Sequence, residues 1–324
     1  MKAIAVMHPG AGPEFVPDFS IPLANREEEV VVRMKAVAIK HLDKMRASGR
    51  HYSTQEAAWT PRVVGSDGVG VMEHGQRVYG MGLNGTMAEQ AAFDPAMLVA
   101  IPEGLDDTIA AALPNAVMGS AMALRFRAKL QAGSTVLING ATGFTGSIAV
   151  QLAKHFGAAR VIATGRNKMA LQGLNALGAD EVISLMEDDQ FITGRIQEIH
   201  RETPIDIVID YLWGHPATLI LNALKGNGRF TPRTSYISIG SMAGDSILLS
   251  SAILRSTDLQ LTGSGLGSWT KDEVAVLFKN IMPEVFDLAA QGKLKAAVET
   301  CHMEDIEQVW NRDISCGKRL VVLL

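Results

Sequence analysis

The spacing of apolar residues changes near residue 106 and divides the chain into two kinds of structure. Before this point, short apolar runs are separated by glycine, proline and asparagine, a pattern that indicates β-strands. These strands are predicted at 2–7, 29–39, 68–72, 77–79 and 97–101. After it, strand-like runs alternate with helical ones, and six strands are predicted at 135–139, 160–164, 181–185, 205–211, 235–239 and 259–262. Such alternation predicts a parallel sheet with helices on both faces.

Helical runs fill the spaces between these later strands. They are predicted at 108–129, 147–156, 167–177, 188–202 and 216–224. A further helix is expected to begin after Thr270, because Thr270 and Glu273 have the spacing of a capping box. The end of the chain, 318–324, again has strand character, and we expect this strand to rejoin the first half of the chain.

Composition and charge narrow the class of protein. The length of 324 residues suggests two domains at a typical ~150 residues each, and 47% hydrophobic residues argue against disorder. The net charge of −4 favours neither nucleic acid nor an anionic membrane as a partner. Two cysteines, Cys301 and Cys316, do not make a disulfide framework, so a cytoplasmic location is expected. The uncharged segment 108–124 is interpreted as a buried helix rather than a membrane span.

A glycine-rich turn follows the strand predicted at 135–139. Gly140, Gly143 and Gly146 lie between this strand and the next helix. Glycine permits a tight turn and close approach to a pyrophosphate, and a helix N-terminus offers N–H groups to an anion. The spacing differs from the G-x-G-x-x-G fingerprint, so the strand–turn–helix context carries the prediction of a dinucleotide site. A turn that binds no ligand is the alternative.

The residues after the second strand favour NADPH over NADH. NAD sites place Asp or Glu about 20 residues past the glycines, where it bonds the ribose hydroxyls. This chain has Arg166 there, and no acidic residue occurs between Gly146 and Asp180. A guanidinium offers paired donors and a positive charge to a 2′-phosphate. The alternative is an ordinary exposed arginine at a helix start, with Lys168 beside it in either role.

Six further stretches are informative when taken together. They occupy 61–70, 110–115, 149–154, 177–183, 206–211 and 317–322. With the glycine turn, they resemble the medium-chain dehydrogenase/reductase superfamily in its zinc-free quinone oxidoreductase-like branch, over nearly the whole chain. The resemblance implies an α/β fold in which a Rossmann domain, 114–262, is inserted into a discontinuous GroES-like β-rich domain, 1–113 and 263–324. It also implies a homodimer, a form common in this family.

The reaction class follows by elimination. Zinc alcohol dehydrogenases carry a cysteine in the region of 39–43 and a Gly-His-Glu motif, whereas this chain has Lys40-His41 and Gly65-Ser66-Asp67. A catalytic zinc needs three protein ligands, so zinc-activated chemistry is disfavoured. The Tyr-x-x-x-Lys pair of short-chain dehydrogenases and the Gly-x-Ser-x-Gly elbow are absent from the sequence. What remains is hydride transfer from NADPH to a quinone or an α,β-unsaturated carbonyl compound.

Three side chains are candidates for the proton or oxyanion donor. Lys40 stands where many quinone oxidoreductases have asparagine, and a solvated strand-end lysine is the alternative. Tyr52 matches a tyrosine that family members often place near the substrate, with His51 one alignment step away. Asn115 is expected either to touch the nicotinamide or to cap a helix that begins after Pro114.

The resemblance also implies the cofactor contacts. We expect Gly140, Thr142, Gly143, Phe144 and Thr145 at the pyrophosphate, Gly165, Arg166 and Asn167 at the adenosine ribose, and Tyr211, Gly240, Ser241, Ser264 and Leu266 after the later strands. Two further hypotheses stay open: a dehydrogenase or reductase of another carbonyl substrate, and a non-catalytic NADPH-binding redox sensor. The departures from the family at Lys40-His41 and Met45 keep the second of these open.

Overall fold

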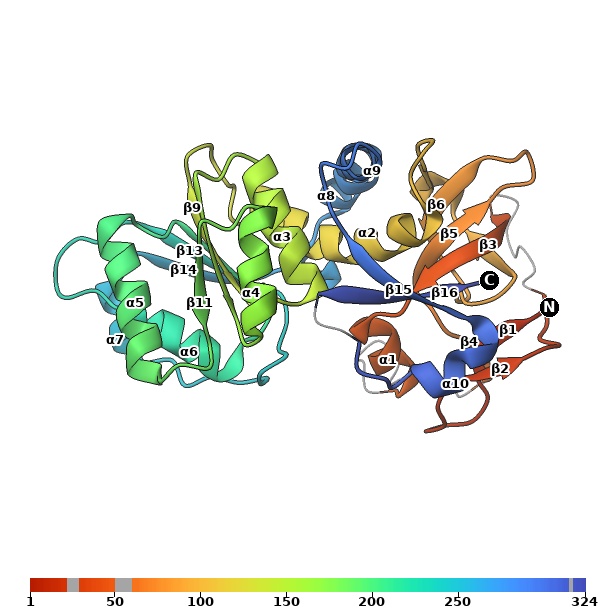
Figure 1. The fold of residues 1–324 in the computed structure, drawn as a ribbon, viewed down its shortest axis with the longest axis horizontal. Coiled ribbons are helices and arrows are strands. Elements are labelled where there is room, and N and C mark those ends of the chain that lie inside the picture. Colours follow the sequence, from red (N-terminus) through yellow and green to blue (C-terminus); the bar gives the residue numbers. More distant parts are fainter. Residues whose placement is uncertain (22–28, 50–59, 315–316) are drawn as a thin grey trace. The chain divides into compact units, whose positions relative to one another are not determined.

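The computed structural model describes residues 1–21, 29–49, 60–314 and 317–324. The chain forms two compact units (Figure 1). Unit 1 comprises Met1–Asn115 and Phe278–Leu324, and unit 2 comprises Ala116–Leu277. The discontinuity of unit 1 means that both ends of the chain build one core. From the sequence, the inserted domain was expected to end at residue 262. Unit 2 instead extends to Leu277, so it also contains the segment 263–277.

Unit 1 consists mainly of strands. Its strands are β1 (Ala3–Val6), β2 (Glu14–Val16), β3 (Val30–Ala38), β4 (Arg62–Val63), β5 (Asp67–Val71), β6 (Arg77–Met81), β7 (Gln90–Phe93), β8 (Val99–Ala100), β15 (Ala297–His302) and β16 (Lys318–Leu323). They form a three-stranded sheet, β2-β1-β4, and a seven-stranded sheet, β15-β16-β3-β5-β6-β8, in which β7 also pairs with β3. Its helices are α1 (His41–Ala47), η2 (Pro95–Met97), α9 (Met282–Ala290), η7 (Met303–Asp305) and α10 (Ile306–Val309).

The last strand returns to the first half of the chain, as predicted. Strand β16 pairs antiparallel with β3, with Val321 opposite Ala38 and Leu323 opposite Ala36. On its other side β16 pairs with β15, a strand that the sequence analysis did not predict. Strand β3 therefore receives partners from both ends of the sequence.

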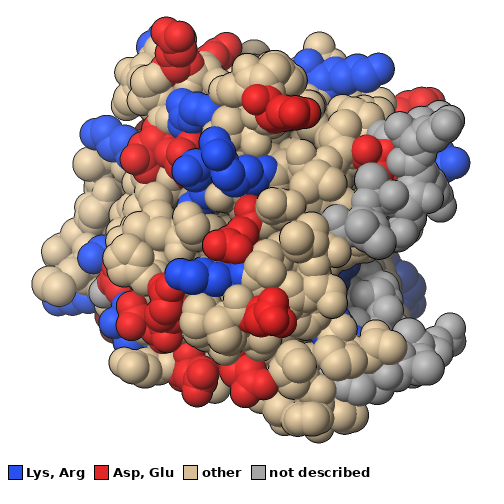
Figure 2. All heavy atoms as spheres, turned by 90° about the vertical axis from the view of Figure 1, so that its right-hand side faces the viewer, with Lys and Arg blue, Asp and Glu red and all other residues tan. Residues whose placement is uncertain are grey.

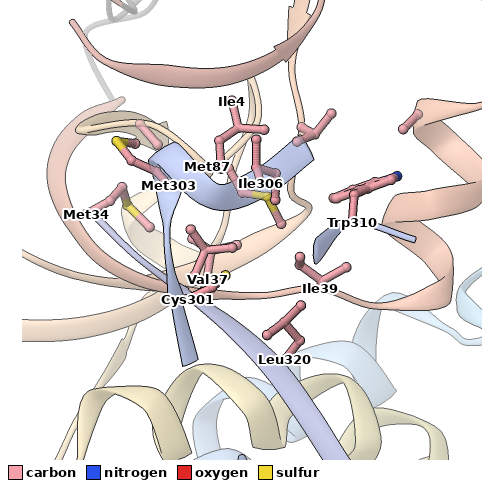
Figure 3. Close-up of a cluster of buried hydrophobic side chains, with 14 of the residues drawn as sticks. Ile4, Met34, Val37, Ile39, Met87, Cys301, Met303, Ile306, Trp310 and Leu320 are labelled. Atoms are coloured by element: carbon pink, nitrogen blue, oxygen red, sulfur yellow. The ribbon is translucent and has the colours of Figure 1, made fainter. Parts of the chain in front are cut away.

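A buried apolar cluster connects these elements of unit 1. Ile4 from β1, Met34 from β3 and Leu320 from β16 lie in it with Trp310, which is 5% exposed (Figure 3). Burying one such aliphatic side chain contributes about 1.5–3 kcal/mol. The alternation of buried and exposed positions along β3 places Met34 on this side, while Arg33 and Lys35 stay exposed.

Unit 2 contains one six-stranded sheet in the order β11-β10-β9-β12-β13-β14. Its strands are β9 (Thr135–Asn139), β10 (Arg160–Gly165), β11 (Glu181–Ser184), β12 (Ile207–Asp210), β13 (Thr234–Ser238) and β14 (Leu259–Gly263). Its helices are α3 (Phe144–His155), α4 (Lys168–Leu174), η4 (Asn175–Leu177), α5 (Asp189–Glu202), α6 (Gly214–Ala223), α7 (Ser251–Ser256), η5 (Leu266–Ser268) and α8 (Lys271–Val276). Every neighbouring pair of strands is parallel, which confirms the predicted α/β fold.

Two helical segments carry the chain between the units. The first is α2 (Asp107–Met122), which continues into the π-helical turn η3 (Ala123–Arg127). Asp106 Oδ1 accepts from the backbone N of Thr108 at 2.8 Å, so the helix begins there and Pro114 lies inside it. The expectation that Asn115 caps a helix after Pro114 is therefore wrong. The second segment is α8, η6 (Leu277–Ile281) and α9, and it begins at the predicted capping box.

The segment Asp107–Arg127 is long and apolar enough to cross a membrane by length and composition. Of its most apolar window, 72% is buried inside the structure. Core helices of soluble proteins share this property, so the segment is weak evidence for a membrane span. Figure 2 shows basic and acidic side chains interspersed on the face that it draws, with no large area of a single sign.

Candidate functional site

The predicted cofactor residues of unit 2 follow the carboxyl ends of five parallel strands. Parallel strands end at one edge of a sheet, and open α/β sheets bind their ligands at that edge. The predicted residues follow or end β9, β10, β12, β13 and β14. Strands β9 and β12 are neighbours at the centre of this sheet.

A chain of buried hydrogen bonds runs across this edge. Thr164 Oγ1 donates to Asn139 Oδ1 at 2.7 Å, and Asn139 Nδ2 donates to Asp210 Oδ1 at 2.8 Å. Tyr236 OH donates to Asp210 Oδ2 at 2.7 Å. These side chains come from four adjacent strands, so the network ties β10, β9, β12 and β13 together. Burial raises the pKa of the Asp210 carboxyl, although the hydrogen bonds that it accepts oppose the rise.

This network also supports the glycine turn. The backbone N of Gly140 donates to Thr164 Oγ1 at 3.3 Å, and that of Ala141 donates to Thr164 O at 2.8 Å. The network was not predicted from the sequence. Its signal was a polar residue, Asn139 or Asp210, at the end of an otherwise apolar strand.

The glycine turn fits a pyrophosphate. Gly140 has φ of +89°, a conformation that favours glycine. A Cβ on Gly146 would lie 2.4 Å from Gly140 O, so the first turn of α3 packs directly on the loop. Gly143 differs, because it is exposed and a Cβ there would lie 3.8 Å from its nearest neighbour, Gly140 O. The turn itself requires Gly140 and Gly146, while Gly143 leaves room for a ligand at the N-terminus of α3.

The end of β10 presents a cation. Arg166 is exposed, and its guanidinium forms no hydrogen bond or ion pair in the described part of the chain. Asn167 Oδ1 accepts from the backbone N of Ala170 at 3.0 Å and so caps α4. The first turn of α4 has no acidic residue. Arg166 and the exposed Lys168 are therefore the cations at this strand end that a 2′-phosphate can pair with, while the carbonyl oxygen of Asn167 caps α4.

The residues after the later strands take different positions. The hydroxyl of Tyr211 is 2.8 Å from Ser120 Oγ, and burial raises its pKa. The Tyr211 hydroxyl thus forms a hydrogen bond inside unit 2 with Ser120. Ser264 is also buried, and its Oγ accepts from Trp269 Nε1 at 3.0 Å. The remaining residues predicted here are half-buried or exposed, namely Gly240, Ser241 and Leu266.

Lys40, a predicted donor in unit 1, is enclosed. Its side chain is 1% exposed, and its Nζ donates to Ala38 O at 3.0 Å and to Asp67 Oδ1. A third acceptor, Asp43 Oδ2, lies 3.2 Å away. Burial lowers the pKa of Lys40, but the charges of Asp43 and Asp67 outweigh it and the net shift is upward. The alternative of a solvated lysine is therefore wrong, and a substrate oxyanion would have to displace one of these oxygens.

The carboxylates around Lys40 have further partners. Tyr79 OH donates to Asp67 Oδ2 at 2.7 Å, and Ser66 Oγ donates to Asp43 Oδ1 at 2.6 Å. Arg319 is buried, and its pKa falls to about 10 because burial outweighs the attraction of the two carboxylates. Two cations thus balance two carboxylates. Lys40 was predicted from the sequence but these contacts were not, because Asp67, Tyr79 and Arg319 are distant from it along the chain and the nearby Asp43 becomes a partner only when both side chains are buried.

The other two predicted donors are Tyr52 and Asn115. Tyr52 lies outside the described residues. Asn115 is half-buried within α2. Among the described residues, no group of three or more His, Cys, Asp or Glu side chains is placed to hold a metal ion.

Known proteins resemble this chain over most of its length. A family model described as zinc-binding dehydrogenase matches residues 145–288. The "Probable NADPH-dependent quinone reductase tdiC" of Emericella nidulans is 26% identical, over 91% of this chain and 92% of that protein. The human mitochondrial enoyl-[acyl-carrier-protein] reductase is also 26% identical, over 91% of this chain and 80% of that protein. Erythronolide synthase EryA2 of Saccharopolyspora erythraea is 33% identical over 67% of this chain, which spans 6% of that synthase.

A solved structure of a quinone oxidoreductase is similar to this chain over its whole length. The quinone oxidoreductase from Thermus thermophilus, also solved in complex with NADPH, is 25% identical and superposes with a TM-score of 0.77 over all of both chains. The chain belongs to the medium-chain dehydrogenase/reductase superfamily, in its quinone oxidoreductase-like branch.

Proposed function

We propose that this chain reduces a quinone or an α,β-unsaturated carbonyl compound with NADPH and without a catalytic zinc ion. The chain is an NADPH-dependent oxidoreductase, as its full-length relatives are named. The observation that carries the proposal is the pair of strand ends in unit 2. A glycine turn fit for a pyrophosphate follows β9, and an exposed arginine follows β10.

The residues of unit 2 supply binding and orientation. Bound NADPH supplies the hydride. We propose that Gly143 and the N-terminus of α3 hold the pyrophosphate, where the helix dipole favours negative charge. Arg166 pairs with the 2′-phosphate, since no carboxylate in the first turn of α4 repels it. The hydrogen-bond network of Asn139 and Asp210 keeps the loop in place beneath them.

The names of the relatives support two acceptor classes. One relative is named a quinone reductase and another an enoyl reductase. Hydride addition to either acceptor leaves negative charge on an oxygen, which a positioned donor stabilises. We propose Tyr52 and Asn115 as candidates for this donor. Lys40 is a weaker candidate for this donor, because its three N–H groups already face oxygens of Ala38, Asp43 and Asp67. We propose instead that Lys40 holds these carboxylates in position.

Lys40 also supports the proposal that the reaction needs no catalytic zinc ion. Its ammonium lies between the carboxylates of Asp43 and Asp67, so it already supplies the positive charge that a bound cation would bring. A second cation there would meet electrostatic repulsion. We also propose a cytoplasmic homodimer, on the family resemblance and the low cysteine content. Light scattering on the purified protein tests the dimer.

The test is turnover with matched cofactors and acceptors. Oxidation of NADPH and of NADH is followed against a naphthoquinone, an enal and an enoyl thioester. Arg166→Ala is compared with Arg201→Ala, which removes an exposed arginine on α5. We expect Arg166→Ala to raise the KM for NADPH at least about tenfold, since a charge-assisted hydrogen bond contributes ~1.5–3 kcal/mol. The KM for NADH, and both KM values of Arg201→Ala, should stay within about twofold.

Three results would contradict parts of the proposal. Equal KM values for NADPH and NADH in the wild type would remove Arg166 from the cofactor site. Absence of turnover with every acceptor, despite tight NADPH binding, would leave another carbonyl substrate as the better hypothesis. Stoichiometric zinc, together with loss of turnover on chelation, would exclude the zinc-independent reaction.

A further inference from the structure

Unit 1 contains a pocket that none of the proposed cofactor contacts uses. Its volume is about 500 Å³, within the range of about 300–1,000 Å³ typical of small-molecule sites. Helix α1, strand β4, the turn after β6 and the segment 19–21 contribute its described lining.

The pocket lining includes basic side chains. Arg46 and Arg62 both line it, and Arg62 Nη2 donates to the carbonyl oxygen of Arg46 at 2.9 Å. Arg46 Nη1 donates to Ser66 Oγ at 3.1 Å. The Nε of Arg46 is buried and has no acceptor among the residues that the structure describes. A buried donor without an acceptor costs about 1–3 kcal/mol, so its presence beside a pocket points to an acceptor supplied by a ligand.

The acidic side chain in the described lining is already neutralised. Asp43 Oδ1 accepts from Ser66 Oγ at 2.6 Å, and Oδ2 accepts from the backbone N of Lys40 at 2.9 Å. The ammonium of Lys40 lies 3.2 Å from the same Oδ2. The charge of Asp43 is therefore balanced within the protein, and the guanidinium of Arg46, with its unpaired Nε, adds positive charge to the pocket lining.

The lining also includes large apolar side chains. Ile21 is 55% exposed and Leu83 is 49% exposed, and both line the pocket with Phe19 and Val63. Large apolar side chains that gather at a concave, partly polar site are typical of ligand pockets. A ligand that contacts both the arginines and these apolar side chains needs an oxyanion and an apolar body.

We propose that this pocket binds a small amphipathic carboxylate, with its oxygens toward Arg46 and Arg62 and its apolar body along Phe19, Ile21 and Leu83. A carboxylate accepts two parallel hydrogen bonds from a guanidinium, which an alcohol does not. The pocket lies within unit 1, so binding requires neither NADPH nor the proposed reduction.

The test compares octanoate with octanol, which share an apolar chain and differ in charge. Calorimetric titration without NADPH measures both affinities in the wild type and in Arg46→Gln, Arg62→Gln and Arg33→Gln. Arg33 is an exposed arginine on β3 outside the pocket lining, so its variant is the matched control. We expect octanoate to bind at least about tenfold more tightly than octanol. Arg46→Gln and Arg62→Gln should each remove most of this difference, and Arg33→Gln should keep it.

A second variant tests the apolar wall. Leu83→Asn should weaken octanoate and octanol by a similar factor, because it changes the body of the site and leaves both arginines in place. Circular dichroism checks that each variant is folded, and Arg62→Gln carries the test if Arg46→Gln is not. Absence of saturable octanoate binding, equal affinity for octanol, or full affinity in both arginine variants would overturn the proposal. These outcomes leave turnover of NADPH untouched and so are distinct from failure of the proposed function.

Discussion

Replacing Lys40 by methionine tests whether its ammonium holds the centre of unit 1. The side chain is 1% exposed and its charge is balanced by Asp43 and Asp67. Methionine retains most of the apolar stem but removes the charge. Two buried carboxylates then face each other with the buried Arg319 as the remaining cation of the network.

The expected loss is large. Removing one partner of a buried ion pair costs about 3–5 kcal/mol of the free energy of unfolding. In the wild type, the raised pKa of Lys40 means that its contribution is fully present below pH 10.5 and declines as the pH rises through the higher value of the folded state.

Urea unfolding followed by tryptophan fluorescence measures the effect, since Trp310 lies in the core of unit 1. Lys35→Met is the control, because Lys35 is an exposed lysine on β3 and its replacement should change stability by less than about 0.5 kcal/mol. Adding Asp67→Asn to Lys40→Met should recover part of the loss. A loss below about 1 kcal/mol at pH 8, similar to that of Lys35→Met, would refute the reasoning.

Three further predictions concern other parts of the chain. Gly146→Ala should weaken NADPH binding at least about tenfold, because its Cβ would lie 2.4 Å from a backbone oxygen, whereas Gly194→Ala, with nothing within 4 Å, should not. Tyr236→Phe should lower the free energy of unfolding by about 1.5–3 kcal/mol, since its hydroxyl donates to buried Asp210; unchanged urea unfolding would contradict this. Burial raises the pKa of Cys301 to about 11, so its thiol should be alkylated far more slowly at neutral pH in the folded than in the unfolded protein, as peptide mass spectrometry can show.

Local pattern determined most elements of unit 2. Strand β9 was predicted at its observed bounds because a continuous apolar run between glycines has few alternatives. In unit 1, β2, β4 and β7 have two to four residues each, and such short strands acquire their identity from the partners that pair with them.

The sequence by itself determined the fold class, the glycine turn and the position of Arg166, because each depends on residues close together along the chain. Tertiary structure alone decided what Lys40 does. Its partner Asp67 lies 27 residues away, and Tyr79, which donates to Asp67, lies farther along the chain; only the pairing of β5 with β3 and β6 brings these residues together. The pocket of Arg46 and Arg62 has the same origin, since burial and an absent acceptor are properties of packing, which no local pattern of residues records.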